Sequence, residues 1–372
     1  MKLSLLLFFL NVIVLYGQSN NQLESVDKFI LAEHNEGRFN GAITIGNGDS
    51  IVYENFIGIA NRTWGQAIQK ETRFDIASIN KSFIAALVLL AVEEGYFTLE
   101  TKLSDLIQKF HPPSKFDCRI TIHQLLTHTS GLGDYSEIDS SLKVNNFRRF
   151  KRLNFTNDEY INFISEIELV GAPNNQFYYS NFAYHLLCIL LEDVYEQDFN
   201  TILQSKICLP LGLESTVNVT DNKIIVDSLA FGYELNNGEW LSNDFIDLRL
   251  GRRIFSTSED LYKWGYWVST NKLLSKNSRT LMFANHIESI NNAISYGYGW
   301  VTFEKGEKFR MGDLGIEKPY FVHGGSTGGY RSILVNVNNS EYIISILGNI
   351  GDEMSEIELT KGILKRLLKD EK

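Results

Sequence analysis

Apolar and polar residues follow two different periods along this chain of 372 residues. The run LESVDKFI places apolar residues three or four positions apart, which predicts an amphipathic helix over residues 22–36. The run GAITIGNGDSIVYENFIGIAN holds two β-rich stretches on either side of Asn47-Gly48. Asn-Gly favours a two-residue turn, so this run predicts a β-hairpin, and the short run TRFDIA predicts a further strand.

The middle of the chain has the pattern of helices joined by loops. Two long stretches, SFIAALVLLAVEE and NFAYHLLCILLEDVY, are largely apolar and predict buried helices, the first of which ends near Gly95. Thr121 and Thr156 stand directly before shorter helical runs, and a glutamate three residues on completes a capping box with Thr156. The run FSTSEDLYKW is expected to begin a helix at Ser256 or Thr257.

The last part of the chain returns to the pattern of strands. SYGYGWVTFE, YFVHGGSTGGYRSILVNV and EYIISILGN predict successive strands, and SEIELTKGILKRLLKD predicts a closing amphipathic helix. The predicted fold is therefore α/β (α+β), an antiparallel sheet built from both termini and flanked by helices, with an inserted, mostly helical domain. Residues 20–85 and 241–372 are expected to form the α/β part, and residues 86–240 the helical part.

The N-terminus has the pattern of an export signal. Lys2 precedes an apolar segment, residues 3–16, which is shorter than the ~20 residues that span a bilayer. Gly17-Gln18-Ser19 offers small residues for cleavage, so residues 1–19 predict a signal peptide and a periplasmic or secreted protein. The alternative is an uncleaved anchor. No later segment is apolar enough to span a membrane.

Charge, cysteine content and histidine spacing disfavour several classes of function. The formal net charge is −10 and no basic run would follow a phosphate backbone, which disfavours nucleic-acid binding. Three cysteines, Cys118, Cys188 and Cys208, are too few for a disulfide scaffold, although one disulfide remains open. The sequence lacks CxxC and HExxH motifs, and His123 and His128 are five residues apart, so we expect no metal.

The segment Ser78-Ile79-Asn80-Lys81 carries the first candidate chemistry. Residues three apart on a helix share a face, so the amine of Lys81 can reach the hydroxyl of Ser78. A serine becomes a strong nucleophile when a neighbouring base takes its proton, and an apolar wall favours the neutral form of a lysine. The alternative is that Ser78 caps the helix and Lys81 extends to solvent.

Two further motifs extend this set. Tyr179 and Asn181 form Y-x-N at the head of an apolar helix, where a phenol can move protons and an amide can bind a lysine or a substrate. The alternative is that Ser180 or Asn181 caps the helix. His323 begins a glycine-rich run whose glycines let a substrate approach the backbone. Its alternative is a bulged strand with a surface histidine.

In this order, S-x-x-K, Y-x-N and H-x-G resemble the serine β-lactamase and penicillin-binding protein superfamily, in its class C-like branch. LLTHTSGL, FSTSEDLYKW and YGYGW are similar to other stretches of that family, and the resemblance covers essentially the whole mature chain. Class A β-lactamases carry S-D-N and K-T-G instead, and this sequence has neither. The resemblance implies a serine hydrolase without a metal or cofactor.

The resemblance also implies a role for each residue. Ser78 would form an acyl-enzyme, with Lys81 and Tyr179 together as general base. Asn181 would orient the lysine and the substrate. The oxyanion hole and the substrate contacts would come from the backbone N–H groups of Ser78 and Ser326 and from the other residues of the H-x-G run, namely His323 and Gly325.

One departure from the family pattern affects specificity. His323 stands where many relatives have a lysine, and an unperturbed histidine titrates around pH ~6.5. We therefore expect a weak, pH-dependent grip on a substrate carboxylate and weak or absent β-lactamase activity. Arg252-Arg253 stands where relatives often have two glycines. This pair could bind an acidic substrate, but a surface pair beside Glu259 and Asp260 is favoured.

The leading prediction is an exported hydrolase of esters, amides or D-amino-acid peptides, with a small-molecule or peptide substrate. A D-Ala-D-Ala carboxypeptidase or a true β-lactamase is the alternative. A third hypothesis is a non-catalytic protein that binds peptidoglycan or peptides. The complete motif set favours an enzyme, because a binding protein does not need Lys81 and Tyr179 together. Loops in the helical part, about residues 133–175 and 220–250, are expected to set specificity, and the oligomeric state stays open.

Overall fold

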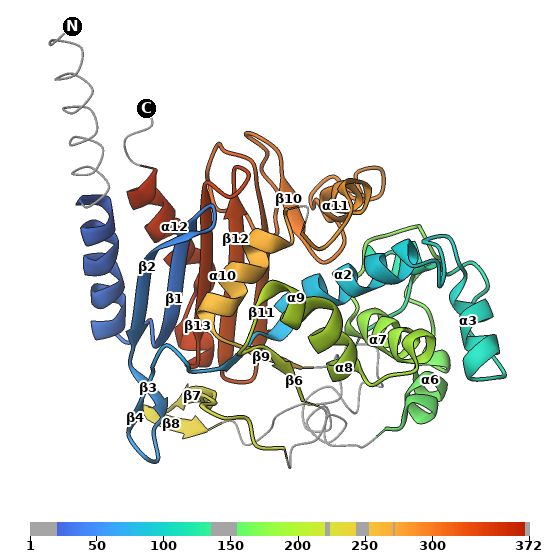
Figure 1. Ribbon diagram of the computed structural model, residues 1–372, viewed down its shortest axis with the longest axis horizontal. Coiled ribbons are helices and arrows are strands. Elements are labelled where there is room, and N and C mark those ends of the chain that lie inside the picture. Colours follow the sequence, from blue (N-terminus) through green and yellow to red (C-terminus); the bar gives the residue numbers. More distant parts are fainter. Residues whose placement is uncertain (1–20, 135–154, 220–223, 243–252, 271, 369–372) are drawn as a thin grey trace, which may run out of the picture.

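The computed structural model describes residues 21–134, 155–219, 224–242, 253–270 and 272–368. A six-stranded antiparallel sheet with the order β10-β11-β12-β13-β1-β2 forms one side of the molecule, and the inserted helices lie beside it (Figure 1). The strands are β1 (Gly41–Asn47), β2 (Ser50–Ile57), β10 (Val301–Phe303), β11 (Tyr320–Thr327), β12 (Tyr330–Val337) and β13 (Tyr342–Gly348). Pairing of β1 with β13 joins the two ends of the chain, which confirms the predicted sheet.

Turn glycines account for most of the strand boundaries. The predicted hairpin at Asn47-Gly48 is confirmed, with Gly48 at a φ of 60°. The run 320–337, predicted as one strand, is two strands, β11 and β12, because the chain reverses at Gly329 with a φ of 77°. The run 295–304 is a strand only in β10, since Gly299, at a φ of 74°, turns the chain just before it.

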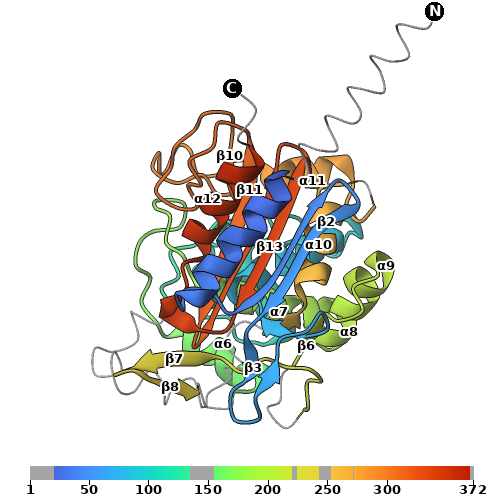
Figure 2. The same cartoon turned by 90° about the vertical axis from the view of Figure 1, so that its left-hand side faces the viewer.

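Helices cover both faces of the sheet. Helical residues 21–35 and α12 (Glu356–Leu367) lie on one face, as Figure 2 shows, and α10 (Ser258–Trp267) lies on the other. Side chains alternate between these layers along each strand. On β12, Ile333 belongs to the core under the first pair of helices, whereas Leu334 packs in the core beside α10.

The inserted region is helical, as predicted, and its two longest helices are almost fully buried. Both are apolar all round, which is the pattern of helices enclosed by other elements. Cys188 lies in the second of these helices as a buried thiol, and all three cysteines are free. The described helices between β5 and β9 are α2 (Asn80–Glu93), α3 (Leu103–Phe110), α4 (Ile122–Leu126), α6 (Asn157–Ser165), α7 (Asn181–Tyr195), α8 (Phe199–Leu203), the π-helical segment η3 (Gln204–Cys208) and α9 (Leu209–Leu211).

The predicted first residues of three helices are confirmed. Thr121 and Thr156 each close a capping box, which satisfies backbone N–H groups at the helix start. Thr257, one of the two expected starts, caps α10 by accepting a hydrogen bond from the N–H of Asp260. Gly95 follows α2 with a φ of 81°, as a residue after a helix often does.

Short strands and turns complete the described chain. A two-residue hairpin at Asn237-Gly238 joins β7 to β8. None of the described helices is both long and apolar enough to cross a membrane. The remaining elements are β3 (Ile59–Asn61), β4 (Gln66–Ala67), β5 (Phe74–Asp75), β6 (Val217–Asn218), β7 (Tyr233–Asn236), β8 (Glu239–Ser242), β9 (Ile254–Ser256), α11 (Lys276–Phe283) and the 3-10 turns η1 (Ala77–Ile79) and η4 (Gly351–Glu353).

Three predictions fall wholly or partly outside the described residues. The signal peptide, residues 1–19, and Arg252 lie entirely outside them. The two loop regions expected to set specificity are described only in part, since residues 135–154, 220–223 and 243–252 are left out.

Candidate active site

Ser78 lies in a tight turn between β5 and α2. The preceding residue, Ala77, has a φ of 47°, a left-handed conformation that costs a residue with a side chain about 1–3 kcal/mol. Asp75 stabilises this turn, because its Oδ1 accepts a hydrogen bond from the Ala77 N–H at 2.7 Å. Helix α2 begins only at Asn80, and its N-cap residue, Ile79, makes no side-chain cap. Ser78 is therefore not the cap of α2, and the capping alternative is wrong.

Lys81 is buried beneath Ser78 rather than extended to solvent. Only 2% of Lys81 is exposed, and its Nζ lies 3.4 Å from Ser78 Oγ. The same Nζ donates to Asn181 Oδ1 at 2.8 Å and lies 4.9 Å from the centre of the Tyr179 ring. The structure thus brings Ser78, Tyr179 and Asn181 around the amine of Lys81, across about a hundred residues of sequence.

Asn181 is held in place by a residue that the sequence analysis did not identify. Its Nδ2 donates to Asp134 Oδ2 at 2.8 Å, which directs its oxygen toward Lys81. Ser180 caps α7 by accepting from the Ala183 N–H at 3.2 Å, so capping and active-site placement occur together at this helix start. Asp134 belongs to no spacing motif, and its role comes from a contact between distant segments.

His128 braces the loop below the site. It is fully buried, its Nδ1 accepts from the Ser180 N–H at 3.1 Å, and its Nε2 lies 3.2 Å from the Tyr296 hydroxyl. Burial, then the charge of Lys81, holds the pKa of His128 well below its usual range. A neutral ring can accept the Ser180 hydrogen bond, and this bond positions the head of α7.

His323 is also buried and neutral, which corrects one expectation. Only 5% of it is exposed, and burial, together with the charge of Lys81, lowers its pKa to about 3. Its Nδ1 lies 2.7 Å from the Gly324 carbonyl, and its Nε2 lies 3.4 Å from the Tyr296 hydroxyl. His323 is neither a surface histidine nor a cation near neutral pH, so the expected pH-dependent grip on a carboxylate is wrong.

Ser78 opens into a pocket of about 490 Å³ that the β11 strand closes on one side. A Cβ on Gly325 would lie 2.6 Å from the Ile76 carbonyl oxygen, so only glycine lets β11 pack this closely on the Ser78 turn. Ser326 follows on the same wall. The pocket is lined by Ser78, Tyr179, Val301, Met311, Gly312, Val322, His323, Gly324, Gly325, Ser326, Glu356 and Ile357.

Arg253 is a buried structural residue, so the surface-pair interpretation is wrong for it. It is 6% exposed and forms an ion pair with Asp75, which is itself 1% exposed. Burial lowers the pKa of Arg253 to about 10, which leaves it charged at neutral pH. Since Asp75 also holds the Ala77 N–H, this ion pair supports the turn that carries Ser78.

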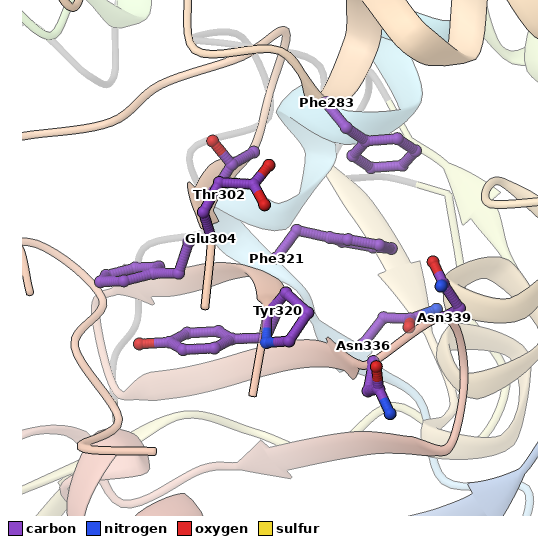
Figure 3. A pocket seen from close by; sticks show the side chains of 10 residues that line it. Phe283, Thr302, Glu304, Tyr320, Phe321, Asn336 and Asn339 are labelled. Atoms are coloured by element: carbon purple, nitrogen blue, oxygen red, sulfur yellow. The ribbon is translucent and has the colours of Figure 1, made fainter. Parts of the chain in front are cut away.

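A second pocket, of about 110 Å³, lies over β10, β11 and β12 and has a different character (Figure 3). Its wall includes Phe283 and Phe321, whose rings stack with centroids 4.2 Å apart. Glu304 is its only ionisable carboxylate, and neither cysteine nor serine lines it. In the part of the chain that the structure describes, no group of His, Cys, Asp or Glu is placed to hold a metal ion. The Ser78 pocket is therefore the candidate active site.

Comparison with known proteins agrees with this geometry. The family model described as Beta-lactamase matches residues 26–367. The chain belongs to this family. The match spans the sheet, the inserted helices and every residue of the Ser78 pocket, so this protein is a serine hydrolase of the β-lactamase family.

Individual relatives are distant and differ in activity. Penicillin-binding protein 4* of Bacillus subtilis (strain 168) is 24% identical over 345 residues, which are 88% of this chain and 71% of that protein. Esterase EstB of Burkholderia gladioli is 29% identical over 190 residues, 48% of this chain and 47% of the esterase. The structure of D-amino acid amidase from Ochrobactrum anthropi SV3, complexed with L-phenylalanine amide, has a TM-score of 0.75 at 19% sequence identity. The match covers 94% of this chain and 99% of the amidase chain.

The neutral state of His323 predicts how substrate preference responds to pH. Nitrocefin carries a carboxylate and 4-nitrophenyl acetate does not, so groups that act on both substrates cancel in the ratio of their kcat/KM values. This ratio should be low, and between about pH 5.5 and 7.5 its pH profile should match that of a His323→Gln variant within roughly twofold, because a group with a pKa of about 3 does not titrate there.

His323→Gln is the matched control because its side chain is neutral at every pH, so any change of the ratio that both proteins share comes from other groups in the pocket. An ordinary histidine facing the substrate would raise the ratio roughly tenfold toward acid pH. Such a rise in the parent protein, absent from His323→Gln, would contradict the buried neutral state of His323.

Proposed function

We propose that this protein is exported and cleaves esters, amides or D-amino-acid peptides through an acyl-enzyme on Ser78. The observation that carries the proposal is the position of the Lys81 amine. It lies 3.4 Å from Ser78 Oγ and 2.8 Å from Asn181 Oδ1, almost fully buried at the base of an open pocket. An amine held next to a hydroxyl in this way is placed to take its proton.

In this mechanism Ser78 Oγ attacks the substrate carbonyl carbon while Lys81 and Tyr179, in the state in which this pair has already given up one of its own protons, together take the hydroxyl proton. The backbone N–H groups of Ser78 and Ser326 hold the oxyanion that forms. Collapse of the tetrahedral intermediate breaks the ester or amide bond, and the leaving group receives the proton. Water then attacks the acyl-enzyme, releases a carboxylic acid and restores Ser78.

The choice of esters and amides over β-lactams rests on charge. β-Lactams and peptides that end in D-Ala carry a carboxylate, and His323 is neutral in the wall that they would meet. The names of the esterase and amidase relatives favour the same substrate classes. A D-Ala-D-Ala carboxypeptidase is the second candidate, favoured by the similarity to Penicillin-binding protein 4*. Export rests on the apolar segment at residues 3–16.

Covalent labelling tests this function directly. A fluorophosphonate should add one adduct to the protein by intact mass, and Ser78→Ala should abolish the adduct, because it removes the oxygen that is labelled. Hydrolysis of 4-nitrophenyl acetate should fall by roughly 10⁴-fold or more in the same variant. Ser205→Ala, at an exposed position outside the pocket, is the control and should still be labelled.

Each other outcome points to a different function. A protein that is labelled neither by fluorophosphonate nor by penicillin is a binding protein, and the proposal fails. A stable penicillin adduct on Ser78, with slow ester hydrolysis, favours the carboxypeptidase.

A further inference from the structure

Glu356 places a carboxylate in the wall of the Ser78 pocket. It is the first residue of α12, which the fold brings to the β11 strand beside the catalytic turn. At Gly324, an added Cβ would lie 3.7 Å from Glu356 Oε1. Ser78 and Glu356 line the same pocket, so a substrate that lies at Ser78 can also reach this carboxylate.

Among the described residues, none forms an ion pair with the Glu356 carboxylate, although it is half-buried. Burial raises its pKa, while its own backbone N–H and the charge of Arg331 lower it. A carboxylate that has lost water without gaining an ion-pair partner is stabilised by a cation that reaches it. The pocket wall therefore holds an acceptor for positive charge.

The nearest cations are already engaged. Arg331 pairs with Asp352 and donates to the Ser326 hydroxyl, and it is not part of the pocket lining. Lys81 is bound to Asn181 below the pocket. Because His323 is neutral, Glu356 is the only charged side chain among the residues that line the described pocket.

Helix stabilisation alone does not explain this position. An acidic residue in a first turn does favour a helix through its dipole. In α12, however, Glu358 supplies that charge from an exposed position, and Ser355 caps the helix by accepting from the Glu358 N–H at 3.4 Å. Glu356 also interacts favourably with the helix dipole, but it is partly buried. An exposed residue such as Glu358 provides this interaction without the cost of burial.

We propose that Glu356 selects substrates that carry a protonated amine or a quaternary ammonium group. This cation pairs with the Glu356 carboxylate while the scissile carbonyl lies at Ser78, and the same carboxylate repels substrates with a carboxylate of their own. The inference rests on the proposed acyl-enzyme function and adds a substrate class to it. Such repulsion is a common source of specificity.

Two pairs of substrates of equal shape test the proposal. D-Alanine 4-nitroanilide and isobutyryl 4-nitroanilide differ by an ammonium against a methyl group on the acyl side. Acetylthiocholine and 3,3-dimethylbutyl thioacetate differ by a quaternary nitrogen against carbon on the leaving-group side. In at least one pair, the parent protein should favour the cationic member in kcat/KM by roughly tenfold or more.

Glu356→Gln removes the charge but keeps the shape, so it should reduce this preference to about twofold or less. Glu358→Gln is the matched control, two residues along the same first turn but outside the pocket, and it should keep the preference of the parent protein. Labelling of Ser78 by a fluorophosphonate checks that each variant has kept its active site.

The outcomes distinguish a failure of the proposed Glu356 role from a failure of the proposed acyl-enzyme function on which it rests. If the parent protein is labelled at Ser78 but hydrolyses both members of each pair equally well, the proposed role of Glu356 is refuted and the proposed acyl-enzyme function is not. This result needs no variant. A preference that survives Glu356→Gln refutes the role of Glu356 as well. A parent protein that is not labelled at Ser78 refutes the proposed function and this inference with it.

Discussion

Replacing Lys81 with methionine should lower kcat/KM for 4-nitrophenyl acetate by roughly 10²–10⁴-fold, the range that positioned proton transfer contributes to catalysis. Methionine nearly matches the length of lysine and suits a site that is 2% exposed, but it cannot take the Ser78 proton. The loss should appear mainly in kcat, because Lys81 lies below Ser78 and does not line the pocket where the substrate binds.

Lys109→Met provides the control for Lys81→Met. Lys109 is exposed at the end of α3, so its loss should leave kcat/KM unchanged. Steady-state kinetics on both variants, together with their thermal unfolding midpoints, separates a catalytic effect from a folding effect. A folded Lys81→Met variant with the activity of the parent protein would show that another group activates Ser78.

Replacing Arg253 with methionine should lower the free energy of unfolding by about 3–5 kcal/mol, the cost of leaving a buried charge without its partner. The residue left behind is Asp75, which is 1% exposed and has no other charged partner among the described residues. Urea unfolding measures this loss. The double variant Arg253→Met/Asp75→Asn should recover part of the stability, since asparagine carries no charge and can still accept from Ala77.

Arg119→Met is the matched control for this pair. Arg119 also pairs with an aspartate, Asp117, but its side chain is 63% exposed, and such surface pairs contribute about 0–1 kcal/mol. If Arg253→Met costs no more than Arg119→Met, the buried pair does not stabilise the Ser78 turn. If the double variant is less stable than Arg253→Met, the unpaired charge of Asp75 is not the cause of the loss.

Short sequence patterns predicted where helices begin, because the hydrogen bonds that start a helix join residues that are close in the sequence. Thr121 and Thr156 cap helices whose starts are visible in the sequence, since a cap bonds only to residues two or three positions on. The long run 320–337 was misjudged. The apolar residues on either side fit a strand, but Gly328-Gly329 between them is a two-residue hairpin signal that the prediction of one strand passed over, and the chain reverses there.

The sequence by itself determined that Ser78 and Lys81 would meet, because residues three apart in a helical turn share a face. It also identified Tyr179, Asn181 and His323 as candidates, through the order of their motifs. Their chemical state was decided by the tertiary structure. His323 was expected to titrate, and Arg253 was expected at the surface, yet both are buried. Asp134 and Glu356 gave no signal at all, since each acts on a residue far away in the chain. Burial and charge depend on the atoms that surround a group in space, and those atoms come from segments that only the fold brings together.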